Sequence, residues 1–346
     1  MDEEIELEEI GIKKKVRIKD LLTIDFHKDI AFENLLGEIL NIDRTKRCKI
    51  IINKKESPIN GGYGFIQFGT RKDINGSIKN IVLKKLLKDK PKNILVEAVL
   101  QHVSYTILKK FNLEYMIPKV YEIYRKPDDE SSSNLPTASP KYILHFSMEE
   151  IKGDYIHTFI KDSHTPEKDF LICLIQISMV FYLLEKNLYL NHRDLRYSNI
   201  YIVKNPKKIQ LEINDKTYKT TSNFHVCVLD FGFACVGKEE SVVNAGGNFI
   251  LDETKCMHTG RDLFYLIMSM WCKNDIRNRM NEAFIEDINN LFKTVNKDYI
   301  QVMDNHGEDS VWPFIMINHH NFSFPPLSPE NLIVSLFDLW HKHFSS

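Results

Sequence analysis

Cysteine is scarce in this chain, and none of it has a metal-binding or redox spacing. The six cysteines form no C-x-x-C pair, and no histidines follow at the distances that a zinc site needs. This pattern indicates neither a zinc site nor a disulfide framework. We therefore expect reduced, partly buried thiols.

An excess of charge of one sign and a membrane-spanning run are also missing. Lysine and arginine total 46 against 47 acidic residues, a balance that argues against direct nucleic-acid binding. The start of the chain is charged where a secretory signal would be apolar. The longest apolar run, 170–184, contains Gln176 and Ser178 and is too short to span a bilayer comfortably. We expect an intracellular protein, cytoplasmic or nuclear, that does not enter a membrane.

The residues that are present indicate an α+β protein with one large core. The chain has 346 residues, of which 43% are hydrophobic, enough for one catalytic unit built of two lobes. Short β-rich runs and one helical stretch occupy 49–151, and longer helical periodicity dominates 152–346. We expect a small β-rich N-terminal lobe, a larger and mainly helical C-terminal lobe, and an N-terminal extension at 1–48.

Two short motifs bring together the side chains that phosphoryl transfer requires. The first runs from His192 to Asn199 (HRDLRYSN), and the second begins at Asp230 (DFG). A carboxylate such as Asp194 can accept the proton of an incoming hydroxyl. An amide oxygen of Asn199 and a carboxylate of Asp230 are hard ligands that Mg²⁺ favours. The alternative is a loop whose carboxylates only form hydrogen bonds, and the order and separation of the two motifs argue against it.

These motifs match the catalytic loop H-R-D-L-x-x-x-N and the D-F-G of protein kinases at every specified position. The chain thus resembles the eukaryotic protein-kinase family. The resemblance implies a two-lobed kinase fold, ATP and Mg²⁺ as cofactors, Asp194 as catalytic base, and Asn199 and Asp230 as metal ligands.

Three glycines resemble part of the loop that covers the ATP phosphates in that family. Gly61, Gly62 and Gly64 lie in the segment NGGYGFI, while Ile59 replaces the first glycine of G-x-G-x-x-G. The resemblance assigns these glycines and Ile66 to nucleotide binding. Without its neighbours the segment would be interpreted as a β-turn.

Lys84 ends an apolar run that resembles the V-A-I-K strand, whose lysine reaches the α- and β-phosphates. Lys85 adjoins it, but neighbouring residues of a strand point to opposite faces, so only one of the two enters the cleft. Lys84 occupies the motif position. Glu97, the acidic residue of the following helical stretch, is its expected partner, and a solvated surface pair is the alternative.

The segment after strand 142–146 resembles the hinge that binds adenine. Backbone groups of Glu149 and Ile151 would bond the base, and Met148 would limit the depth of the adenine pocket. A methionine is equally common as core filler.

Further along, Asp262 resembles the aspartate that opens the central helix of the large lobe and braces the catalytic loop. The insertion around 209–220, with a turn at 214–216, is similar in layout to the haspin branch of the family. No A-P-E tripeptide follows Gly232, and the interval to Asp262 is short for the family. We therefore expect activity that does not depend on activation-loop phosphorylation.

The resemblance implies an ATP-dependent protein kinase acting on a protein substrate, which would be a chromatin protein if the chain is haspin-like. Arg196 stands where serine/threonine kinases usually place lysine; its guanidinium can clamp phosphate, so a tyrosine acceptor stays open. We favour serine/threonine. Two alternatives are a pseudokinase scaffold and a small-molecule kinase of the same fold. The sequence names neither the substrate nor the oligomeric state.

Overall fold

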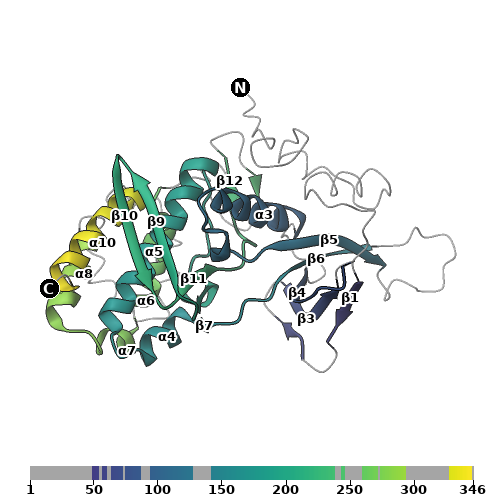
Figure 1. Ribbon diagram of the computed structural model, residues 1–346, viewed down its shortest axis with the longest axis horizontal. Helices are drawn as coiled ribbons and strands as arrows, with labels where there is room; N and C mark the ends of the chain where they lie inside the picture. The colour runs from purple at the N-terminus through teal and green to yellow at the C-terminus, as the bar shows by residue number, and fades with distance from the viewer. Residues whose placement is uncertain are drawn as a thin grey trace. The chain divides into compact units, whose positions relative to one another are not determined.

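The computed structural model describes residues 49–53, 57–60, 64–72, 75–86, 94–127, 142–237, 243–245, 259–271, 273–293 and 327–344. The protein is a mixed α+β chain with a multi-stranded antiparallel sheet and several helices (Figure 1), which confirms the predicted α+β class. It divides into two compact units. The first comprises Met1–Ile107, Ile117–Glu150 and Phe231–Cys256, and the second comprises Leu108–Met116, Ile151–Asp230 and Met257–Ser346.

A six-stranded antiparallel sheet forms the frame of the first unit. Its order is β1-β3-β4-β6-β5, and β2 pairs with β3 off this path. The strands are β1 (Lys49–Ile52), β2 (Ile59–Asn60), β3 (Gly64–Lys72), β4 (Ile78–Leu86), β5 (Val120–Pro127) and β6 (Tyr142–Glu149). Two further short strands, β12 (Cys235–Val236) and β13 (Val243–Asn244), pair with each other.

The central strand β4 pairs with β3 on one edge and β6 on the other, and its residues 81–84 are buried on both faces. Ile81 and Leu83 are at most 2% exposed on one face, and Lys84 is buried on the other. Helix α3 (Ile94–Lys110) adds the apolar side chains of Leu95, Val99 and Val103 to the core. Burial of such aliphatic side chains is the main term that stabilises this unit.

One cysteine differs from the sequence-based expectation of reduced thiols. Cys235 in β12 is disulfide-bonded, so the expectation is wrong at this position. Cys173 and Cys227, both in the second unit, are buried and form no disulfide, as expected.

Helix α5 (Pro166–Leu188) is the central element of the second unit. Proline at its first turn suits a helix start, and Tyr189 ends it in the left-handed conformation (φ 49°). The helix is apolar on nearly all sides, and Phe170 stacks on Trp271 of helix α6 (Arg261–Trp271) with ring centroids 5.6 Å apart. By length and composition α5 could cross a membrane, but 89% of that apolar window is buried inside the protein, as in a core helix.

A polar residue in the middle of α5 fixes the strand that leads to the second motif. The amide of Gln176 donates to Ser222 Oγ (3.1 Å) and to the carbonyl oxygen of Phe224 (3.3 Å). Its side-chain oxygen accepts the N–H of Val226 (2.9 Å) in strand β11 (His225–Val228). Each polar atom of this buried amide therefore has a partner, as burial requires.

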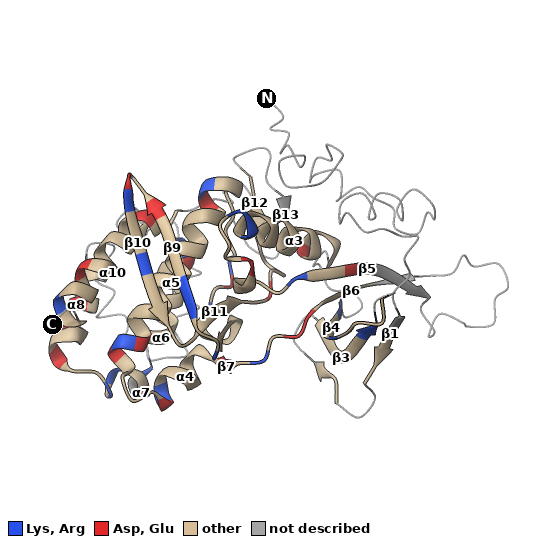
Figure 2. Ribbon diagram, viewed as in Figure 1, with Lys and Arg blue, Asp and Glu red and all other residues tan. Residues whose placement is uncertain are grey.

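The insertion predicted around 209–220 is a β-hairpin, formed by β9 (Lys207–Ile213) and β10 (Lys216–Ser222). Asn214 and Asp215 both have positive φ (49° and 62°), the conformation of a two-residue type I′ turn. Lysines occur along both strands and Asp215 lies at the turn (Figure 2). The inner face of the hairpin packs Tyr218 against Phe337 of helix α10 (Pro329–Phe344), with ring centroids 5.0 Å apart.

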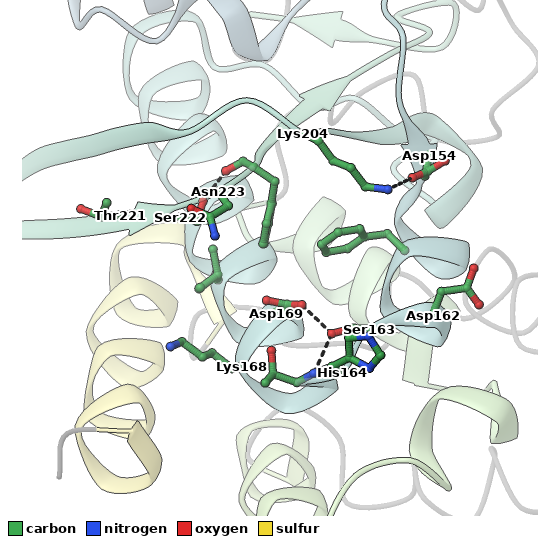
Figure 3. Close-up of a pocket in the computed structure, with 14 residues that line it drawn as sticks. Asp154, Asp162, Ser163, His164, Lys168, Asp169, Lys204, Thr221, Ser222 and Asn223 are labelled. Carbon is green, nitrogen blue, oxygen red and sulfur yellow. Dashed lines mark hydrogen bonds and ion pairs between the residues drawn. The ribbon is translucent and has the colours of Figure 1, made fainter.

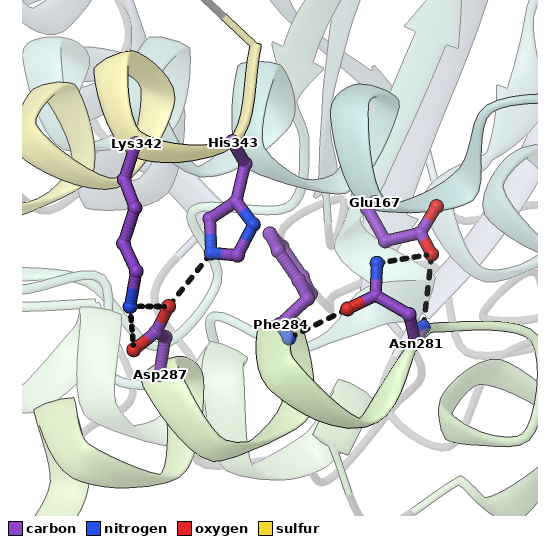
Figure 4. Close-up of polar contacts among 6 residues, drawn as sticks. All are labelled: Glu167, Asn281, Phe284, Asp287, Lys342 and His343. Atoms are coloured by element: carbon purple, nitrogen blue, oxygen red, sulfur yellow. Dashed lines mark hydrogen bonds and ion pairs between the residues drawn. The ribbon is translucent and has the colours of Figure 1, made fainter.

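Helix α10 buries Leu332, Ile333 and Leu336. Helix α8 (Glu282–Lys293) holds the end of α10 through Asp287, which accepts hydrogen bonds from Lys342 and His343 (2.6 and 2.7 Å to Oδ2; Figure 4).

The start of α8 is fixed by a side chain of its own. Asn281 Oδ1 caps the helix by accepting the N–H of Phe284 (2.8 Å; Figure 4). Glu167 of α5 in turn accepts the backbone N–H of Asn281 (2.9 Å). These contacts fix α8 and α10 against α5.

The remaining described elements of the second unit are short. They are η2 (Glu114–Met116), β7 (Asp154–Tyr155), α4 (Ile156–Asp162), η4 (Tyr197–Asn199), β8 (Ile200–Val203) and α7 (Asn274–Arg277).

Candidate active site

Strand pairing in the second unit brings the two sequence motifs together. Strand β8 begins directly after Asn199, and β11 ends two residues before Asp230. The two strands are antiparallel, with Ile200 opposite Val228, so the start of one lies beside the end of the other. The backbone N–H of Leu229 donates to the carbonyl oxygen of Asn199 (2.9 Å). Asn199 and Asp230 are therefore neighbours in space although 31 residues separate them in sequence.

Asp262 braces the first motif from the start of α6, as the sequence predicted. Its carboxylate is 1% exposed and accepts the backbone N–H groups of His192 (2.6 Å) and Arg193 (2.8 Å). Hydrogen bonds to a charged acceptor are short and strong. They hold the loop one and two residues before the proposed base.

The ring of His192 links the loop to the second motif. Its Nε2 atom lies 2.9 Å from the carbonyl oxygen of Leu229, directly before Asp230. In the sequence, His192 stands out only by its place in the motif. A lone histidine has no local signal for such a contact, because its partner is 37 residues away.

The side chain of Asn199 is oriented by Asp194. Its amide nitrogen donates to the backbone oxygen of Asp194 (2.7 Å) and to Asp194 Oδ2 (3.0 Å), and both residues are buried. Because the nitrogen is used in this way, the amide oxygen is the atom that Asn199 presents to a cation. This orientation is the one that an oxygen-coordinated Mg²⁺ requires.

Asp194 lies in a strongly perturbed electrostatic environment. Burial raises the pKa of its carboxyl group above the usual range, and the nearby charge of Asp230 raises it further, while Arg196, His192 and Asn199 act in the opposite direction. Two carboxylates that repel each other, one of them buried, favour a bound cation. A perturbed carboxyl group of this kind is characteristic of functional sites.

Arg196 lies at the exposed edge of the same group. Its Nε atom is 3.4 Å from Asp194 Oδ1, and 49% of its side chain is exposed. The side chain is therefore open to solvent, and a forked guanidinium can bind carboxylates and phosphates.

The backbone is left-handed at two non-glycine residues of the site. Arg193 has φ 66° and Asp230 has φ 59°. Such conformations cost of order 1 kcal/mol or more for a non-glycine residue and persist where the surroundings enforce them. Here the contacts of Asp262 and the β8–β11 pairing enforce them.

In the first unit, Lys84 forms an ion pair with Glu97, the partner expected from the sequence. Lys84 Nζ donates to Glu97 Oε1, and the two side chains are 8% and 1% exposed. Lys85 points to the other face, where its ammonium group lies 4.6 Å from the centroid of the Phe65 ring. The alternation of side chains along β4 thus separates the two lysines as expected. The surface-pair alternative is wrong, because this pair is buried.

The described part of the glycine segment lies against Lys84. Ile66 is the register partner of Lys84 in the β3–β4 pairing. A Cβ atom on Gly64 would lie 3.5 Å from Lys84 Cε and 3.3 Å from the backbone oxygen of Lys85. A Cβ atom would therefore fit beside the lysine stem but would crowd the Lys85 oxygen. Gly61 and Gly62 lie outside the described residues.

The predicted adenine-binding segment begins at the end of β6. The backbone N–H of Glu149 donates to the carbonyl oxygen of Lys119 (2.9 Å), so an adenine would have to use the carbonyl oxygen of Glu149. The sulfur of Met148 accepts a hydrogen bond from Gln101 (3.4 Å). Ile151 follows and belongs to the second unit.

The structure thus brings together Asp194, Arg196, Asn199 and Asp230 in the second unit, and Lys84, Glu97, Gly64 and Ile66 in the first. Among the described residues no group of three or more histidine, cysteine or acidic side chains could hold a metal ion by itself. A magnesium ion that keeps water and nucleotide phosphates as ligands needs fewer protein groups.

Two neighbours of the loop were missed by sequence reasoning. The ammonium group of Lys273 lies 4.6 Å from the centroid of the Tyr197 ring, and the His157 ring lies 5.6 Å from the same ring. A cation over an aromatic face stabilises both groups. These contacts join α4, η4 and the start of α7 and fix the loop from its outer side.

Removing the ammonium group of Lys84 should destabilise the fold. Lys84→Met leaves Glu97 buried without its cation, and we expect the free energy of unfolding to fall by about 3 kcal/mol in urea denaturation. Lys85→Met is the matched control and should change the free energy of unfolding by less than about 0.5 kcal/mol. Adding Glu97→Leu to Lys84→Met should restore most of the loss; no recovery would show that the pair is not the cause.

Glu185 of α5 should make stability depend on pH. It is 6% exposed, and burial raises its pKa from 4.5 to about 9; the nearby Asp262 adds to the shift, while the N–H of Gly260 (3.3 Å) opposes it. Because the folded pKa exceeds the unfolded one, the folded state keeps a proton that the unfolded state loses above pH 4.5. The contribution of Glu185 to the free energy of unfolding is fully present below pH 4.5 and falls as pH rises toward 9.

Glu185→Gln removes this titration and keeps an acceptor for Gly260. We expect the variant to gain about 4 kcal/mol relative to wild type between pH 5 and pH 8, measured by urea denaturation at both values. An equal difference at the two pH values would contradict this assignment.

No model of a protein family matches the chain, and no curated protein sequence matches it either.

Proposed function

We propose that the protein is a magnesium-dependent protein kinase that transfers the γ-phosphate of ATP to serine or threonine hydroxyls of a protein substrate. The observation that carries the proposal is the convergence of the buried Asp194 and Asn199 with Asp230, with the amide oxygen of Asn199 left for a cation. The two-lobed kinase fold and an intracellular location belong to the same proposal.

The residues of the site have distinct roles in this reaction. Asp194 orients the acceptor hydroxyl and takes its proton. Arg196 contacts the phosphate during transfer through its forked guanidinium. Lys84, held by Glu97, binds the α- and β-phosphates, and Gly64 lets the backbone of β3 approach them. Asp262 keeps the loop in place through its two backbone hydrogen bonds.

The donor set fits a bound Mg²⁺. Asn199 and Asp230 would hold it through oxygen atoms, and it would neutralise negative charge on the phosphates. The repulsion between Asp194 and Asp230 supports this assignment, because a cation between carboxylates lowers their mutual cost.

The test is transfer of label from γ-labelled ATP to a mixture of proteins and, separately, to a mixture of small metabolites. We expect label on protein, and phosphoamino-acid analysis should find it on serine or threonine. Label only on metabolites would favour a small-molecule kinase. No transfer with retained ATP binding would favour a pseudokinase. In the same assay, phosphatase-treated protein should be as active as untreated protein, because we propose no dependence on activation-loop phosphorylation.

A further inference from the structure

A cavity of about 740 Å³ lies in the second unit, apart from the groups described above (Figure 3). Its walls come from β7, α4, the start of α5 and the segment that joins β10 to β11. Phe159, Ile172 and Phe224 give it an apolar lining, and the two phenylalanine rings lie 4.7 Å apart at 60°. A cavity of this size admits two or three side chains of an extended peptide.

The charges around the cavity favour a cation. Lys204 is neutralised by Asp154 (3.0 Å; Figure 3). Lys168 also lines the cavity, and its ammonium group lies over the ring of Trp340 on α10 (5.7 Å). Asp162 and Asp169 contribute two further carboxylates to the lining, so the charged groups sum to a negative value.

One of these carboxylates is held in place by the protein. Asp169 accepts a hydrogen bond from Ser163 Oγ (2.5 Å; Figure 3), and Ser163 is buried. The hydroxyl also accepts the N–H of Thr165 (2.9 Å). A carboxylate held in this way is ready to accept charged donors from a ligand without first being ordered.

The cavity is built on the same scaffold as the catalytic loop. Asp154 lies in β7, which pairs with β8 through Asp154 opposite Ile202. Strand β8 begins directly after Asn199, and His157 of α4 packs against Tyr197 of the loop. A segment bound in the cavity would therefore be held at a fixed place relative to Asp194.

We infer that this cavity is a docking site for an arginine-bearing segment of the protein substrate, separate from the acceptor residue. An arginine fits better than other side chains because its flat guanidinium stacks on aromatic rings and its fork matches carboxylates. The apolar lining would receive neighbouring aliphatic side chains. The inference rests on the proposed function only in assigning the segment to a protein substrate. Binding of the segment does not depend on catalysis.

Binding is tested on the full chain with the fluorescein-labelled peptide Gly-Leu-Arg-Leu-Gly and its counterparts with Gln or Glu in the central position. We expect saturable anisotropy for the arginine peptide and at least tenfold weaker binding of the other two. The double variant Asp162→Asn/Asp169→Asn should weaken the arginine peptide about tenfold. Equal binding of all three peptides to wild type, or no binding, would overturn the inference.

A second variant locates the site without removing a carboxylate. Asn223 is exposed at the cavity rim, so Asn223→Arg should fold and place a guanidinium of the protein's own in the cavity. Loss of peptide binding in this variant is expected, and unchanged binding would place the peptide elsewhere and refute the assignment. Glu212→Gln, an exposed change on β9, is the matched control and should leave binding unchanged.

Kinetics separate this inference from the proposed function. Fusing the arginine segment to a serine acceptor peptide through a flexible linker should lower KM about tenfold with kcat unchanged, because docking raises the effective concentration of the acceptor. The double variant should remove this gain, and a gain that survives it would contradict the inference. Arginine-selective binding without any phosphoryl transfer would overturn the proposed function and leave the cavity as a peptide site.

Discussion

Asp194→Asn should lower kcat for phosphoryl transfer by about 10²–10⁴-fold, the usual contribution of a positioned general base. Asparagine keeps the shape of the side chain and an oxygen that can accept the hydrogen bond from Asn199. It cannot take a proton from the acceptor hydroxyl. The affinity for ATP should change little, because Asp194 is not among the proposed metal ligands.

The comparison needs a control in the same loop. Ser198→Ala changes a neighbouring, partly exposed residue to which no role is given, and it should keep kcat within a few-fold of wild type. The melting temperature of each variant should show that the fold is intact. A kcat for Asp194→Asn close to that of wild type would remove this residue from the mechanism.

Asp262→Ala should destabilise the protein by about 3 kcal/mol or more and abolish measurable transfer. The change leaves the N–H groups of His192 and Arg193 buried without their acceptor. Each hydrogen bond to a charged group is worth about 1.5–3 kcal/mol. The loop that carries Asp194 would lose the contacts that fix its position, so catalysis falls together with stability.

Two further variants separate the brace from a general loss of charge. Asp262→Asn keeps one acceptor oxygen and should lie between wild type and Asp262→Ala in urea denaturation. Asp275→Ala removes an exposed aspartate on α7 that pairs with His157 (3.2 Å) and Lys161 (3.4 Å). Exposed pairs contribute little, so we expect a change of about 0.5 kcal/mol. Equal losses for Asp262→Ala and Asp275→Ala would refute the bracing role.

Local patterns in the sequence were sufficient for several elements. The apolar run 170–184, too short to span a bilayer comfortably, lies in the buried helix α5, and the turn expected at 214–216 joins the strands of the β9–β10 hairpin. Side-chain alternation predicted that Lys84 and Lys85 point to opposite faces, as the structure shows, and the motif position selected Lys84. These features depend on neighbours in sequence, where periodicity and turn chemistry give a signal.

Features that depend on partners distant in sequence could not be predicted from local patterns. The orientation of the Asn199 amide, the contact of His192 with the Leu229 carbonyl and the burial of Glu185 arise only when separate segments pack together. The disulfide at Cys235 was wrongly excluded, because cysteine spacing says nothing about pairs that are distant in sequence. The boundaries of the lobes and the roles of the site residues stay predictions.

A crystal structure of the protein with Mg²⁺ and a non-hydrolysable ATP analogue tests the central claim most directly. The account predicts oxygen atoms of Asn199 and Asp230 about 2.1 Å from the metal, Lys84 Nζ in contact with the α- and β-phosphates, and Asp194 facing the γ-phosphate. A nucleotide bound away from Lys84 and Asp230, or a crystal without nucleotide at saturating concentration, would contradict it.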